Sequence, residues 1–222
     1  MRIVCLANSR KLTGRCIAGR IWDGSTAGEW IRPVSDRAER EVSEYERQYE
    51  DGSDPQPLDI VEIPILEALP DTYQAENWLL DPEYYWEKKG VMEHATLRNL
   101  VEPTSPLWID GHSTYNGEND YVPLSEAEML QDSLRFVSVS EVNLKVFAPG
   151  KAFGNSKRRV QGQFRYAGAT YSLWVTDPNQ ERKWLAQANG EYAIGECYLT
   201  ISLGEPYEGR VYKLIAAIIE DK

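Results

Sequence analysis

The sequence predicts a mostly β protein (all-β or α+β) made of two small β-barrels, with short helices and a long irregular excursion. Alternating and β-branched runs dominate both ends of the 222-residue chain. A stretch dense in Pro, Gly, Asn, Ser and Asp, 103–124, separates them. The expected organisation is therefore an N-terminal barrel with an acidic excursion over 1–102, a linker with a short helix over 103–133, and a C-terminal barrel over 134–222.

The N-terminal half shows strand patterns first and an irregular region after them. Turn-forming residues join the second and third strand patterns. The charged stretch 36–50 has few apolar positions and predicts an exposed helix or a mobile loop. One short helix is expected over 90–101. The expected strands span 3–7, 15–22, 29–32 and 58–66.

The C-terminal half opens on a helix signal and then returns to strands. Ser125 and Glu128 have the spacing of a capping box, which predicts a helix over 126–132. Asp177 and Pro178 have the cap and first-turn chemistry of a helix over 178–189. The expected strands span 134–147, 159–166, 170–176, 197–203 and 210–219, and the middle pair forms a hairpin around 167–169.

Charge is unevenly distributed along the chain, whose net charge is −11. Residues 48–142 carry four Lys/Arg against twenty Asp/Glu, whereas 143–183 carry eight against two. Such an acidic protein is a poor indiscriminate binder of DNA, because phosphate attraction dominates non-specific binding. A local basic groove could still hold a short nucleic acid or a nucleotide. The basic segment could equally dock on the acidic one and hold the barrels together.

Other features favour binding over catalysis and a cytoplasmic location. No apolar run approaches the roughly 18 residues of a membrane helix, and the N-terminus is typical of a strand rather than a signal peptide. Three scattered cysteines suit buried free thiols in a reducing compartment. His94 and His112 lack metal-ligand spacing to any cysteine, so no metal or cofactor is expected. A carboxylate- and Mg²⁺-dependent nucleotide-processing enzyme is the third and weaker hypothesis.

Several motifs together resemble a bacterial family, the dual OB-containing domain. The first half carries CLANSRKLTGRCIAG from residue 5, WIRPVS from 30, LDIV from 58 and QAEN from 74. The second half carries YSLWVTDP from 171, YLTISLGEP from 198 and YKLIAAII from 212. The resemblance implies two tandem OB-like barrels, nucleic-acid or nucleotide recognition, and a link to bacterial defence or DNA processing. OB folds also bind oligosaccharides and proteins, so the fold alone does not decide the ligand.

Two candidate sites lie in the first half of the predicted N-terminal barrel. Polar and cationic side chains of the first loop could hold a phosphate, or could form an ordinary solvated turn. Trp30 and Arg32 could stack on a base, with Pro33 directing Arg32 outward. The alternative places Trp30 in the core and pairs Arg32 with an acid from 36–46. The candidate residues of the two sites are Asn8, Ser9, Lys11, Arg15, Trp30, Arg32 and Ser35.

The remaining candidates are amides and a second basic segment. Gln74 and Asn77 could read base edges with paired hydrogen bonds, although amides also lace irregular loops. Lys157, Arg159 and Tyr166 interleave cations with an aromatic ring, as a single-strand groove requires, although a charge run is more often a solvated face. Lys213 could grip a ligand, but the structural interpretation of its strand is favoured.

The leading hypothesis is a non-catalytic protein that recognises a short single-stranded nucleic acid or a nucleotide on both barrels. The alternative, from another class, is a regulatory subunit whose acidic 48–142 region binds a basic protein partner. An acidic face that covers the groove, together with no affinity for oligonucleotides, would identify the protein as such a regulatory subunit.

Overall fold

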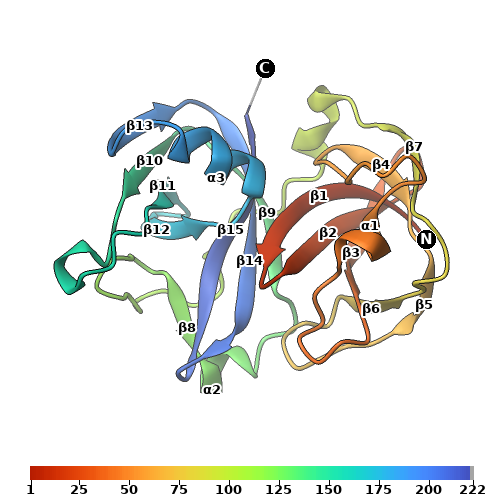
Figure 1. The fold of residues 1–222 in the computed structure, drawn as a ribbon, viewed down its shortest axis with the longest axis horizontal. Helices are drawn as coiled ribbons and strands as arrows, with labels where there is room; N and C mark the ends of the chain where they lie inside the picture. Colours follow the sequence, from red (N-terminus) through yellow and green to blue (C-terminus); the bar gives the residue numbers. More distant parts are fainter. Residues whose placement is uncertain (221–222) are drawn as a thin grey trace. The chain divides into compact units, whose positions relative to one another are not determined.

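The computed structural model describes residues 1–220 and divides them into two compact units. Unit 1 contains residues 1–100 and 131–133, and unit 2 contains 101–130 and 134–220. Each unit is built on one sheet with a few short helical turns, which confirms the predicted mostly β fold (Figure 1).

Unit 1 is a seven-stranded sheet with two short helical segments. Its strands are β1 (Arg2–Lys11), β2 (Gly14–Trp22), β3 (Ala27–Val34), β4 (Asp59–Glu62), β5 (Ile65–Ala68), β6 (Asn77–Leu80) and β7 (Glu87–Val91). Its helices are α1 (Glu44–Arg47) and the 3₁₀ helix η1 (His94–Asn99).

The strand order of unit 1 is β5-β6-β3-β2-β1-β4-β7. The first three strands form an antiparallel meander, and β4 pairs antiparallel with β1. At the other side of the meander β6 runs parallel to β3, with Arg32 opposite Asn77. A meander closed by one parallel and one antiparallel strand is the pairing pattern of an OB barrel.

Several expectations for unit 1 need correction. The single strand expected over 58–66 is two strands, because Pro64 lacks the N–H that would continue the ladder. Within 36–50 only α1 is helical, and a capping box between Ser43 and Glu46 starts it. Strand β6 and most of β7 lie in a region to which the sequence patterns assigned no element, and β7 ends at Val91, inside the helix expected over 90–101, of which only η1 is helical.

Unit 2 is an eight-stranded sheet with three short helical segments. Its strands are β8 (Tyr121–Pro123), β9 (Leu134–Val139), β10 (Val142–Phe147), β11 (Arg159–Tyr166), β12 (Ala169–Val175), β13 (Gly190–Ile194), β14 (Cys197–Tyr207) and β15 (Arg210–Glu220). Its helices are α2 (Leu124–Ala127), the 3₁₀ helix η2 (Lys151–Phe153) and α3 (Pro178–Leu185).

The sheet of unit 2 repeats the path seen in unit 1. Its order is β13-β10-β11-β12-β15-β14-β9, and β8 pairs with β15 outside this path. The meander is β10-β11-β12, the antiparallel flanking strand is β13, and the parallel one is β15, with Trp174 opposite Leu214. Each unit therefore contains the same five-strand arrangement.

The helix signals of unit 2 had different outcomes. Asp177 caps α3 by accepting from the backbone N–H groups of Asn179 and Gln180, as its place before Pro178 predicts. The box predicted at Ser125 does not form, because Ser125 lies inside α2, whose N-cap is Pro123. The predicted hairpin of β11 and β12 is present, and strand β13 was not predicted.

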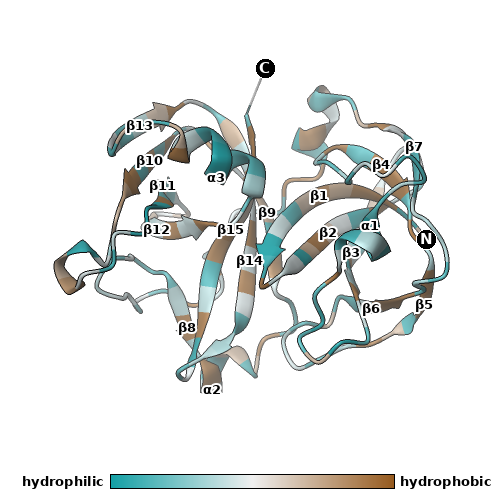
Figure 2. Ribbon diagram, in the orientation of Figure 1, coloured by the Kyte–Doolittle hydropathy of each residue, from teal (hydrophilic) through white to brown (hydrophobic). Residues whose placement is uncertain are grey.

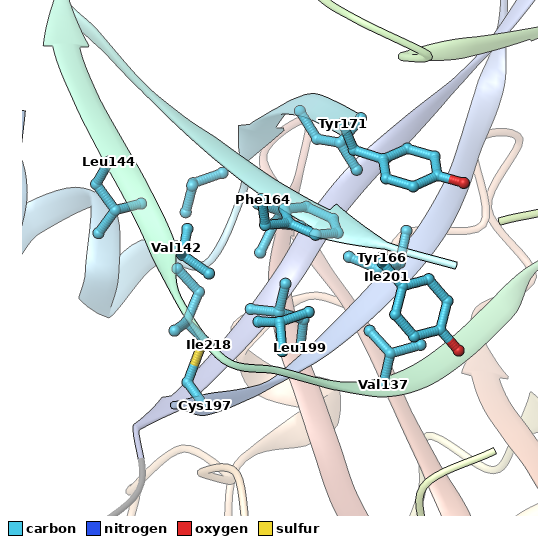
Figure 3. Close-up of a cluster of buried hydrophobic side chains, with 14 of the residues drawn as sticks. Val137, Val142, Leu144, Phe164, Tyr166, Tyr171, Cys197, Leu199, Ile201 and Ile218 are labelled. Carbon is cyan, nitrogen blue, oxygen red and sulfur yellow. The ribbon is translucent and has the colours of Figure 1, made fainter. Parts of the chain in front are cut away.

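Each unit has its own hydrophobic core. The core of unit 2 gathers side chains from all strands of the five-strand arrangement and from β9 and β14, including Phe164 and Tyr171, whose rings stack at 5.5 Å (Figure 3). Burial of alternate residues on β10 leaves Asn143, Lys145 and Phe147 on the opposite face. In unit 1, β1 is hydrophobic over most of its length and hydrophilic at its C-terminal end (Figure 2).

The segment expected to be a linker, 103–133, is mostly part of unit 2. Residues 103–130 belong to that unit, where Leu107 is fully buried in the core and Val122 is fully buried on β8. Only 131–133 belong to unit 1. The polar composition that indicates a linker here serves tight turns, which need the same residue types.

The three cysteines are free thiols. Cys5 and Cys197 are buried and Cys16 is half-buried. Burial raises the pKa of the Cys197 thiol to about 12, with a further contribution from the nearby carboxylate of Glu220. This thiol is therefore protonated and unreactive at neutral pH.

Candidate functional site

The predicted first-loop site lies on the β1–β2 hairpin of unit 1. Asn8 donates a hydrogen bond to the carbonyl of Pro55 (2.8 Å), and the buried hydroxyl of Ser9 donates to the carbonyl of Cys16 (3.3 Å). Ser9 therefore stabilises the hairpin itself, and Asn8 attaches the hairpin to the segment that precedes β4. Lys11 and Arg15 stay half-exposed on its surface.

The predicted Trp30 site is divided between surface and interior. Trp30 is half-buried, with the guanidinium of Arg20 5.6 Å from its ring centroid. Arg32 does not point outward as expected: it is buried and pairs with Glu76 at 3.1 Å. Ser35 is also buried and donates to the carbonyl of Glu41 (2.7 Å). An acid outside 36–46, Glu76, therefore pairs with Arg32 in the interior.

The two amides proposed to read bases contact each other instead. Asn77 donates from Nδ2 to Oε1 of Gln74 at 3.1 Å, and both residues are buried. They lie beside Glu76 in the chain segment that leads into β6. Buried amides cannot reach a ligand at the surface of this unit.

The C-terminal candidates also separate into core and surface. Tyr166 is only 9% exposed and packs in the core of unit 2 (Figure 3). Lys213 is buried, donates to the carbonyl of Ile109 (2.7 Å) and to Asp110 (3.1 Å), and burial lowers the pKa of its ammonium group. Arg159 and Lys157 remain at the surface.

Arg159 lines a cleft of about 570 Å³ on unit 2. Its guanidinium lies 4.0 Å from the ring centroid of Trp174, which is a close cation–π contact. Arg159 begins β11 and Trp174 is the penultimate residue of β12. The other lining residues are Thr114, Tyr115, Asn116, Pro149, Gly204, Glu205, Tyr207, Arg210, Tyr212 and Leu214.

Strand alternation extends this cation–aromatic surface onto β10. Phe147 stacks on Trp174, with ring centroids 5.8 Å apart and planes at 25°. Lys145, two positions earlier and on the same face, lies 5.1 Å from the Phe147 ring. Two cations and two aromatic rings therefore alternate across three neighbouring strands.

A second cation–aromatic group reaches the cleft from β8 and β15. Tyr121 and Tyr212 face each other across these strands with ring centroids 6.3 Å apart. The guanidinium of Arg210 lies 5.0 Å from the centroid of the Tyr121 ring. A hydrogen bond with Tyr212 raises the pKa of Arg210 above its usual value. Arg210 is thus a permanent positive charge beside two phenol rings.

The third wall of the cleft is a turn over 114–117, inside the segment that was expected to be a linker. Tyr115 is 95% exposed at this turn. The turn, Arg210 and Trp174 were not among the predicted site residues. Alternation along β12 could have found Trp174, because its neighbours Leu173 and Val175 are the inward-facing apolar residues.

The arrangement supports two kinds of contact with a ligand. Flat aromatic faces offer stacking, and Arg159 and Arg210 offer charge-assisted hydrogen bonds to an anion. Among residues 1–220 there is no cluster of three or more His, Cys, Asp and Glu side chains that could hold a metal ion. In the same range, no helix is long and apolar enough to cross a membrane.

Comparison with known proteins gives one match. The family model of the dual OB-containing domain matches residues 1–218, nearly the whole chain. No curated protein and no solved structure shows a significant match. The match agrees with the two five-strand arrangements described above, one in each unit. The chain therefore belongs to the dual OB-containing domain family.

Proposed function

We propose that the cleft of unit 2 binds single-stranded nucleic acid, or a nucleotide derived from it. The observation that carries the proposal is the 4.0 Å contact of Arg159 with Trp174 in a cleft that Arg210 and Tyr212 also line. Unpaired bases stack on aromatic side chains and phosphates bind arginine, so this surface suits both parts of a nucleotide.

Charge distribution supports a local site over general binding. The protein is acidic overall, yet the cleft and its surroundings carry Lys145, Arg159 and Arg210. Lys157 and the exposed Phe153 lie in the loop between β10 and β11, which in an OB barrel joins the first two strands. A protein binding short single strands in this way would serve bacterial defence or DNA processing, as the family resemblance implies.

The proposal is tested by fluorescence anisotropy with labelled single- and double-stranded DNA and RNA at two salt concentrations. We expect single strands to bind more tightly than duplexes. Replacing Trp174 with Ala should weaken binding by about 5- to 150-fold, the effect of removing one base–aromatic stack. Replacing Arg159 with Ala should also reduce the salt dependence, by about 0.7 in the slope of log K against log salt for each phosphate that the protein no longer neutralises.

A matched control is available on the same strand. Arg165 is an exposed arginine of β11 that lines a different hollow, with Gln163 and Asn143. Its replacement with Ala changes net charge as much as Arg159→Ala does, but should leave affinity within about twofold because exposed charges outside the site are screened. Equal reductions of affinity in both variants would show general charge attraction and contradict a site at the cleft.

A second proposal, from a different class, concerns unit 1. Exposed carboxylates of Glu50, Asp51 and Glu87 surround a hollow of about 510 Å³ that Tyr49 and Trp86 also line. Such a surface suits a Lys/Arg-rich protein segment. Titration with a labelled arginine-rich peptide tests it, and an affinity unchanged by Glu50→Gln with Asp51→Asn would reject it.

A further inference from the structure

The turn Thr114–Gly117 forms one wall of the cleft, is held in place by hydrogen bonds, and presents the side chains of Tyr115 and Asn116. Resting on the function proposed above, we infer that this turn sets base specificity: Tyr115 stacks on a bound base and Asn116 reads the edge of that base, with adenine favoured. Three features of the turn support this role, namely its rigidity, its attachment to the sheet and the side chains that it presents.

The turn is held from beneath by the carboxylate of Asp120, which is 1% exposed. Asp120 accepts hydrogen bonds from the backbone N–H of Thr114 (2.8 Å) and from its hydroxyl (2.6 Å). The N–H of Gly117 closes the turn on the carbonyl of Thr114 (3.3 Å). A Cβ at Gly117 would lie 2.0 Å from the Asp120 carboxylate, so only glycine allows this approach.

Further contacts attach the turn to the sheet. Glu118 exchanges two backbone hydrogen bonds with Ser172 of β12, at 2.9 and 3.4 Å. Asn119 donates to the carbonyl of Thr170 (2.9 Å), and Gln161 of β11 donates to the carbonyl of Asn116 (2.5 Å). A wall fixed on both sides loses little conformational entropy when a ligand binds, which favours affinity and selectivity.

Tyr115 and Asn116 present the two groups that recognition of a base requires, an aromatic ring and an amide. The ring of Tyr115 is almost fully exposed although it is a large aromatic side chain. In the described chain, 1–220, the side-chain amide of Asn116 makes no hydrogen bond to protein, whereas its backbone carbonyl is used. Both residues line the same cleft as Trp174, so a base entering it meets a ring and an amide from the turn.

The chemistry of the amide indicates which base it favours. Asparagine offers one acceptor and one donor side by side, and adenine presents the complementary donor and acceptor at N6 and N7. Gln74 and Asn77, the amides that the sequence suggested for this role, are buried and hydrogen-bonded to each other in the interior of unit 1. Asn116 is therefore the amide placed to contact a base.

The experiment compares labelled oligo(dA), oligo(dC) and oligo(dT) of about ten nucleotides, long enough to cover one OB site. The wild-type protein should prefer oligo(dA) over oligo(dT) by at least about fivefold, the lower end for one bidentate pair. Asn116→Ala should remove this preference while oligo(dT) affinity stays within about twofold of the wild-type value. Tyr115→Ala should weaken all three by about 5- to 150-fold, and Tyr115→Phe should restore binding.

Two controls and one competitor complete the design. Tyr45→Ala removes another highly exposed ring, which belongs to unit 1, and Asn143→Ala removes another surface amide; neither residue lines the cleft. Adenosine monophosphate competing as well as oligo(dA) would identify a free nucleotide as the ligand, whereas weak competition would identify a strand. Circular dichroism melts confirm that each variant is folded.

The outcomes separate this inference from the function on which it rests. No oligonucleotide binding by the wild-type protein would reject the proposed function. Binding that depends on Trp174 but shows no adenine preference, or a preference that survives Asn116→Ala, would reject the role of the turn alone. A uniform loss of affinity with Tyr115→Ala that Tyr115→Phe does not restore would contradict stacking.

Discussion

Arg32 provides the sharpest test of whether a predicted binding residue is structural. Its guanidinium is 4% exposed, lies 3.1 Å from the Glu76 carboxylate and donates to the Ser133 hydroxyl at 2.7 Å. Arg32→Ala would leave the carboxylate of Glu76, itself 5% exposed, without its countercharge. Breaking a buried pair in this way costs about 3–5 kcal/mol. That is a large part of the roughly 5–15 kcal/mol that stabilises a typical native protein.

The assay is urea denaturation followed by tryptophan fluorescence and by circular dichroism, with anisotropy measured on the same samples. Arg32→Ala should lower the free energy of unfolding by about 3–5 kcal/mol, whereas replacing the pair together, with Arg32→Met and Glu76→Leu, should cost far less. Two probes are needed because the two units need not unfold together. A destabilisation below about 1 kcal/mol combined with weaker oligonucleotide binding would refute the structural role.

Three further predictions concern stability. Burial raises the pKa of Glu46, but hydrogen bonds from Ser43, the N-cap of α1, and from Arg37 outweigh burial and lower this pKa below its usual value. The contribution of this carboxylate to the free energy of unfolding is therefore complete above pH 4.5 and is lost at lower pH. Glu46→Gln should lower the free energy of unfolding by about 1 kcal/mol at neutral pH and by less near pH 3, as measured by urea denaturation. Gly19→Ala would place a Cβ 2.2 Å from a backbone oxygen and should cost about 1–3 kcal/mol, whereas Gly195→Ala, with open space, should be neutral in thermal melts. Lys213→Met should cost about 2 kcal/mol by removing two buried hydrogen bonds, against under about 0.5 kcal/mol for the exposed Lys145→Met.

Periodicity predicted the strands that bury one face and missed those that do not. Strands β11 and β12 alternate over seven or more residues, and their expected bounds differ from the observed ones by one residue at most. Strand β7 has no buried residue, and β13 has one, so neither shows a period-two pattern. These two strands form because their backbones pair with β4 and β10 in the folded sheet, and their own residue patterns do not predict them.

The candidate site was harder to predict because the sequence does not show whether a charged or amide side chain is buried or exposed. Arg32, Asn77 and Lys213 all have the chemistry of ligand contacts, and each is used in the interior. The turn around Tyr115 has the composition of a linker, and what makes it rigid is its contacts with the buried Asp120, six residues after Thr114, and with the strands β11 and β12. A contact across that spacing depends on tertiary structure.

The two units differ at the junction between their parallel strands, which is β3 with β6 in unit 1 and β12 with β15 in unit 2. In unit 1 the parallel strands meet at Arg32 and Asn77, which are buried and contact other buried side chains: Arg32 pairs with Glu76, and Asn77 donates to Gln74. In unit 2 the junction is Trp174 and Leu214, both half-exposed and both lining the cleft. A repeated scaffold thus uses one junction for stability and leaves the other open. Substitutions at Arg32 should therefore change unfolding and leave ligand affinity intact, while substitutions at Trp174 should do the reverse, and a shared effect would contradict this division.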